Sequence, residues 1–87
     1  MNTIVKVPVL EYERGWGSKV DDHMICLDNS IATKFVAEFN SKNTDAVTPD
    51  WYMVANSPEI FEATDSQIIA LKETSDEKMW LSQLKDK

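Results

Sequence analysis

Cysteine is scarce in this sequence, and that scarcity excludes one class of small protein. Cys26 is the only cysteine among 87 residues, so no internal disulfide can form. Secreted domains of this size that depend on disulfides carry several cysteine pairs. No apolar run approaches the ~20 residues that a membrane-spanning helix needs. We therefore expect a cytoplasmic protein without a membrane partner.

Histidine is equally scarce, which argues against a metal site or cysteine–histidine catalysis. His23 is the only histidine, and with Cys26 it offers two ligands where structural zinc usually takes four. Three residues of separation on a strand place the two side chains on opposite faces, out of each other's reach. Carboxylate pairs are uninformative, because fifteen acidic residues produce accidental pairs. The sequence thus predicts no catalytic, cofactor or metal site, and a protein that is not an enzyme.

Cationic side chains are absent from residues 43–71. The whole chain has fifteen acidic residues against nine basic ones, a formal charge of −6. Binding to nucleic-acid backbones depends on clustered Lys and Arg, so this charge disfavours it. The cation-free stretch contains five carboxylates, namely Asp45, Asp50, Glu59, Glu62 and Asp65.

The only two glycines mark a turn between two predicted strands. Gly15-Trp16-Gly17 tolerates positive φ and predicts a hairpin joining residues 3–14 to residues 18–27. The first strand changes its alternation by one residue after Val9, which is what a bulge produces. Pro8 cannot donate a ladder hydrogen bond, so we expect an edge position or a bulge there.

Apolar spacing predicts one amphipathic helix after this hairpin. Asp28-Asn29-Ser30 supplies N-cap residues, and Ile31, Phe35 and Phe39 recur at helical spacing. Residues 51–55 alternate as a third strand. Residues 67–72 fit either a helix behind a capping box or a short strand.

A second capping box, Thr74-Ser75-Asp76-Glu77, predicts a C-terminal helix with an apolar face. The predicted fold class is α+β, with a small antiparallel sheet of three to four strands packed on one face by the amphipathic helix. We expect residues 1–87 to form a single domain, because a chain of this length holds one core.

The predicted hairpin turn is the first candidate binding site. Trp16 lies between two glycines and is flanked by Arg14 and Lys19. The indole could anchor a protein interface, or it could stack on a nucleic-acid base while the cations meet phosphates. A third possibility is that Trp16 folds back and covers the core.

The acidic, aromatic stretch is the second candidate. Asp50, Trp51, Tyr52 and Glu59 combine carboxylates with aromatic rings, a combination that suits a basic partner surface. The ordinary alternative is a solvated acidic face.

Three segments resemble small uncharacterised accessory proteins of tailed bacteriophages. The matching pieces are Glu13–Lys19, Phe39–Asn43 and Pro49–Ala55, and together the resemblance covers about residues 9–55. It carries no active site. It implies a protein of the infected host's cytoplasm that binds a host enzyme or defence component.

The sequence therefore favours a non-enzymatic binding module, phage-encoded, that modulates or inhibits a host protein. The competing hypothesis is a nucleic-acid accessory protein that uses the Arg14–Lys19 turn. Both a monomer and a homodimer fit the sequence.

Overall fold

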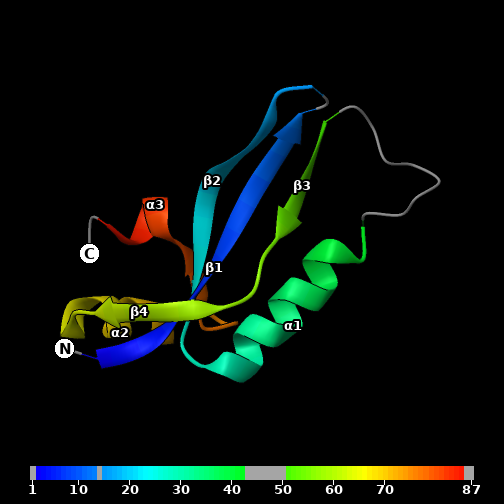
Figure 1. The fold of residues 1–87 in the computed structure, drawn as a ribbon. Helices are drawn as coiled ribbons and strands as arrows, with labels where there is room; N and C mark the ends of the chain where they lie inside the picture. The colour runs from blue at the N-terminus through cyan, green and yellow to red at the C-terminus, as the bar shows by residue number, and fades with distance from the viewer. Residues whose placement is uncertain (1, 14, 43–50, 86–87) are drawn as a thin grey trace.

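The computed structural model describes residues 2–13, 15–42 and 51–85, with Trp51 described by its backbone alone. These residues form five strands and three helices (Figure 1). In chain order the elements are β1 (Asn2–Glu13), β2 (Gly17–Cys26), α1 (Asn29–Asn40), β3 (Trp51–Ala55), β4 (Glu59–Ala63), α2 (Asp65–Lys72), β5 (Lys78–Trp80) and α3 (Leu81–Leu84). The α+β class is confirmed, with one strand more than expected.

β1 is the central strand of an antiparallel sheet. β2 pairs with most of its length, as the predicted hairpin requires, and β5 adds outside β2. On the other edge of β1, β3 pairs with Val9–Glu13 and β4 pairs with Asn2–Lys6. β3 and β4 therefore follow one another along the same edge, separated by residues 56–58.

Pro8 lies opposite this separation. The edge position predicted for Pro8 is wrong, because β1 is central. The backbone N–H of Asn56 donates to the carbonyl of Pro8 at 2.9 Å, and the nitrogen and carbonyl of a strand residue face the same neighbour. The Pro8 nitrogen has no hydrogen to donate. Residues 56–58, which face it, do not pair with β1, so the missing donor costs the sheet few hydrogen bonds.

The predicted bulge is confirmed beside Pro8. Val9 pairs with Asp22 while Leu10 pairs with Val20, so the register shifts by one residue. The extra residue is Asp21, which places the bulge in β2 rather than in β1. A bulge increases the local twist of a hairpin. Beyond it, β1 and β2 continue toward the hairpin tip with β3 alongside (Figure 1).

α1 packs on one face of the sheet, as its apolar spacing predicts. The Asp28 carboxylate caps the helix by accepting the Ile31 N–H at 2.9 Å, and this hydrogen bond lowers the pKa of Asp28. Phe35 is buried against the strands. The buried residues of this first core cluster are Val7, Val9, Met24, Cys26, Ala32, Phe35 and Ala55.

The end of α1 is held to β3 by Asn40. Its side-chain amide donates to the Ala55 carbonyl at 2.9 Å, and its oxygen accepts the Ala55 N–H at 2.8 Å. The amide thus pairs with the outer edge of β3 as a neighbouring strand would.

The opposite face of the sheet carries a second core cluster, which the sequence analysis did not predict. α2 and α3 pack there, so helices cover both faces rather than one. Its buried residues are Ile4, Ile25, Ala63, Ala70, Leu71 and Leu84. Residues 67–72 are therefore helical, and the Thr64–Gln67 capping box is present.

The predicted C-terminal helix is present as α3, but it begins later and is shorter than the capping box at residues 74–77 implies. Glu77 adopts φ 55°, a left-handed conformation that does not continue a helix, and residues 78–80 form β5. Met79 packs in the second core cluster and Trp80 in the first. This alternation between the two faces requires a strand, and the helical part is reduced to Leu81–Leu84.

Cys26 is expected to be inert in the folded protein. Its side chain is fully buried, and this burial is the main cause that raises its pKa from 9.0 to about 11. At pH 8 the folded protein therefore holds almost no thiolate, the form that reacts. Labelling with a thiol-reactive disulfide should be negligible without denaturant and stoichiometric in denaturant. Fast labelling of the native protein would contradict the packing of β2 against α1.

Candidate functional site

The tip of the β1–β2 hairpin has a backbone that only glycine adopts easily. Gly15 and Gly17 have φ of 84° and 80°, and nothing lies within 4 Å of a Cβ placed on either. The constraint at both positions is thus conformational rather than steric. The Trp16 N–H donates to the Glu13 carbonyl at 3.0 Å and closes the turn. The predicted turn is confirmed, and it fixes the backbone of Trp16 between two left-handed residues.

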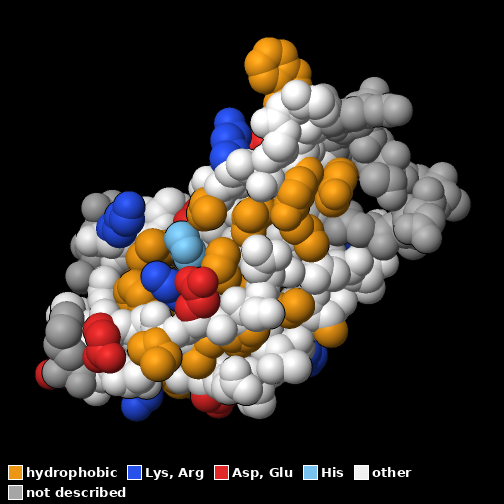
Figure 2. All heavy atoms as spheres, in the orientation of Figure 1, with side chains coloured by type: hydrophobic (Ala, Val, Ile, Leu, Met, Phe, Trp, Pro, Cys, Tyr) orange, Lys and Arg blue, Asp and Glu red, His pale blue; other side chains and the backbone are white. Residues whose placement is uncertain are grey.

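Trp16 extends into solvent from this tip. It is 85% exposed, the highest value among the large hydrophobic side chains that the structure describes. Figure 2 shows a hydrophobic side chain standing clear of the surface at this end. Of the alternatives that the sequence leaves open, folding back over the core is therefore not observed.

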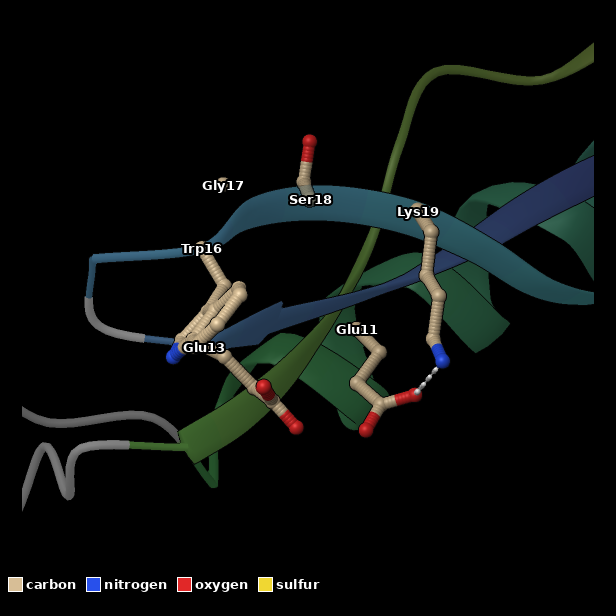
Figure 3. Close-up of a pocket in the computed structure, with 6 residues that line it drawn as sticks. All are labelled: Glu11, Glu13, Trp16, Gly17, Ser18 and Lys19. Carbon is tan, nitrogen blue, oxygen red and sulfur yellow. Dashed lines mark ion pairs between the residues drawn. The ribbon is translucent and has the colours of Figure 1, made fainter.

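One side of the indole borders a shallow cleft. Figure 3 shows the side chains of Trp16, Glu13, Glu11 and Lys19 on the same side of the hairpin. The Lys19 ammonium lies 3.7 Å from the Glu11 carboxylate. We call this the hairpin cleft; its volume is about 220 Å³, and its lining is Glu11, Glu13, Trp16, Gly17, Ser18 and Lys19.

The other face of the sheet at this end is apolar. Leu10 pairs with Val20 and Val54, and Tyr12 pairs with Tyr52. The two tyrosine rings stack at 5.2 Å with an interplanar angle of 9°. Val20 is 53% exposed and the other four are half-buried.

We call these five residues the hairpin apolar face: Leu10, Tyr12, Val20, Tyr52 and Val54. They belong to neither of the two core clusters of the described residues. Hydrophobic side chains gather over this end of the sheet in Figure 2. The β1–β2–β3 end therefore presents a charged cleft on one side of Trp16 and an apolar sheet face on the other.

The register brings parts of the two predicted sites to one end of the sheet. Glu13 pairs with Gly17 on one side and with Trp51 on the other, so the backbone of Trp51 aligns with the hairpin tip. Lys19 lies in the cleft and Tyr52 on the apolar face. Arg14 and Asp50, both predicted to bind a partner, lie outside the described residues, as does the side chain of Trp51.

Glu59 does not join this end. It lies on β4 opposite Lys6, and the two side chains form an ion pair at 4.0 Å. Tyr52 lies opposite Tyr12, six residues farther along β1, which is a separation of about 20 Å. The stretch containing Tyr52 and Glu59 is therefore not one continuous binding face.

A second hollow, between α1 and α3, has its carboxylate already engaged. The Asp22 carboxylate accepts the Ser82 hydroxyl at 2.7 Å and the His23 backbone N–H at 2.7 Å. The bond from Ser82 connects β2 to α3, so we assign Asp22 a structural role. The hollow has a volume of about 350 Å³ and is lined by Asp21, Asp22, Phe39, Met53, Trp80 and Ser82.

His23 and Cys26 lie on opposite faces of β2, as expected. The register is regular between them, and Cys26 faces α1 in the first core cluster. Within the described ranges, no group of three or more His, Cys, Asp or Glu side chains could hold a metal ion.

Comparisons with known proteins leave the site to be interpreted from its geometry. No family model, curated protein or solved structure matches this chain. Among the described residues, no helix is long and apolar enough to cross a membrane.

The residues predicted from the sequence include Trp16, Lys19 and Tyr52 at this end of the sheet, but not Glu13 or the other four residues of the hairpin apolar face. The alternation of Leu10 and Tyr12 with Glu11 and Glu13 was a usable signal, because it places apolar and acidic side chains on opposite faces of one strand. What the sequence did not reveal is that the described helices pack elsewhere and leave Leu10 and Tyr12 uncovered.

Proposed function

We propose that this protein is a non-enzymatic binding module that attaches to a partner protein through the β1–β2–β3 end of its sheet. The observation that carries the proposal is Trp16, 85% exposed at a turn whose two glycines hold it away from the core. Tryptophan is the residue type most enriched among the side chains that dominate binding energy at interfaces.

The surroundings of Trp16 support an interface of ordinary composition. The hairpin apolar face supplies an aromatic pair and aliphatic side chains, and the cleft supplies charged groups at the rim. Interfaces combine an apolar, aromatic centre with a polar margin in this way. The turn hydrogen bond from the Trp16 N–H restrains its backbone, which limits the backbone freedom lost when a partner covers it.

The partner that we propose is a host protein. The resemblance to accessory proteins of tailed bacteriophages motivates this choice, together with the cytoplasm of the infected host as the place of action. In this proposal the module modulates or inhibits its partner by occupying a surface, since it contributes no chemistry of its own.

Nucleic-acid binding by the turn is less well supported. Lys19 is paired with Glu11, and Glu13 lines the same cleft, so the described charges around Trp16 are net negative. The formal charge of the whole chain, −6, also opposes binding to phosphates.

The test is affinity capture from bacterial host lysate with three immobilised proteins. Wild type and Ile69→Ala should retain a stoichiometric protein partner, and Trp16→Ala should lose it. Ile69 is the matched control because it is also an exposed apolar side chain, 59% exposed, but lies on α2. Retention by Trp16→Ala, or no stoichiometric partner at either low or high salt, would contradict the proposal.

A further inference from the structure

Among the described residues that line the hairpin cleft, the charge is unbalanced. They supply two carboxylates and one ammonium. The ammonium, Lys19, lies beside Glu11, whereas no ion pair connects Glu13 to another described residue. The Glu13 carboxylate is exposed and lies next to Trp16 in Figure 3.

An aromatic face beside a carboxylate is suited to a cation. The ring attracts a positive charge placed over it, and tryptophan does so most strongly. A guanidinium can stack flat on the indole while its N–H groups bond to the carboxylate, which a compact ammonium cannot do. A neutral side chain lacks the positive charge that strengthens both interactions, and an acidic side chain is repelled by Glu13.

We infer that the hairpin cleft receives an arginine side chain of the partner, stacked on Trp16 and bonded to Glu13. This inference rests on the proposed function and specifies the chemistry of its partner. The cleft volume of about 220 Å³ is enough for one guanidinium and part of its aliphatic stem, but not for a folded element.

The charge of the whole chain also favours a basic partner. The formal charge of −6 attracts a basic surface over long range and repels an acidic one. Long-range attraction alone would favour any basic patch. The paired indole and carboxylate select arginine within that patch.

The experiment titrates the full-length protein with two capped tripeptides, N-acetyl-Gly-Arg-Gly-amide and its citrulline counterpart. Citrulline keeps the shape of arginine and removes its charge. The readout is the indole N–H signal of Trp16 in ¹H–¹⁵N spectra, assigned with Trp16→Phe. The arginine peptide should shift this signal saturably and bind at least about threefold more tightly than the citrulline peptide at low salt.

Glu13→Gln should remove this preference for arginine. Glu73→Gln also removes one negative charge, but at the end of α2, away from the cleft. This variant should therefore prefer the arginine peptide to the citrulline peptide as strongly as wild type does. Equal affinity for the two peptides, or equal affinity of Glu13→Gln and Glu73→Gln for the arginine peptide, would overturn the inference.

The outcome is separable from that of the proposed function. A partner whose capture depends on Trp16, found together with no preference for the arginine peptide, would leave the binding module standing and refute the arginine site. A clear preference for the arginine peptide, found together with no partner whose capture depends on Trp16, would support the arginine site and refute the proposed binding module.

Discussion

Leu71→Ala is expected to lower the free energy of unfolding by about 2–5 kcal/mol, the range for a buried leucine whose removal leaves a cavity. Leu71 lies on α2 and is fully buried in the second core cluster. Alanine is a good helix former, so the loss arises from packing and not from helix propensity. An 87-residue domain has a total stability of roughly 5–10 kcal/mol, and such a loss is therefore a large fraction of it.

Ile69→Ala is the matched control for this prediction. Ile69 lies on the same helix, two residues away, and is 59% exposed. Its replacement should change the free energy of unfolding by no more than about 0.5 kcal/mol. Urea denaturation followed by circular dichroism measures both. Equal effects of the two substitutions would show that α2 does not pack on the sheet through Leu71.

Trp16→Ala is expected to weaken binding to the captured partner by about 30-fold or more, the effect of losing an interface residue worth at least 2 kcal/mol. The stability of the free protein should stay within about 0.5 kcal/mol of wild type, because an exposed side chain contributes little to folding. Isothermal titration with the purified partner and urea denaturation measure the two quantities.

The combination of the two results is what identifies a binding residue. A loss of affinity together with a loss of stability would indicate that Trp16 packs against the fold, contrary to its 85% exposure. Trp16→Phe should recover part of the affinity, since phenylalanine retains an aromatic face. Full affinity in Trp16→Ala would place the interface elsewhere on the surface.

The elements that the sequence predicted well are those formed by local signals. The glycines on either side of Trp16 determine the hairpin turn, and Asp28 with the stripe of Ile31 and Phe35 determines α1. The change of alternation after Val9 marks the register shift, although the extra residue, Asp21, lies in β2. For the turn and α1, the residues that produce the structure are within a few positions of one another.

The elements that it missed depend on contacts between distant segments. β4 pairs with the first half of β1, and β5 pairs with the end of β2. The capping box at residues 74–77 suggested a helix directly after it, yet Met79 and Trp80 pack into different core clusters, as residues of a strand do. A sheet with two buried faces removes the polar–apolar alternation from which strands are recognised.

The candidate site also combines features that follow from local sequence with features that depend on distant contacts. The exposed Trp16 follows from a local turn, and Lys19 from its neighbourhood in the sequence. The hairpin apolar face required the register between β1 and β3, because Tyr12 and Tyr52 are forty residues apart in the chain and stack only in the folded protein. The separation of Tyr52 from Glu59 required the same register.

Site-specific photo-crosslinking in cells of the proposed bacterial host tests the central claim most directly. The photoreactive residue p-benzoylphenylalanine would replace either Ser18 or Ile69. Ser18 is exposed beside the tip and pairs with Tyr12 of the hairpin apolar face, and Ile69 is exposed on α2. We predict one crosslinked partner protein from position 18 and none from position 69. Crosslinking from position 69 alone, or from neither position, would contradict the assignment of the hairpin end as the binding surface.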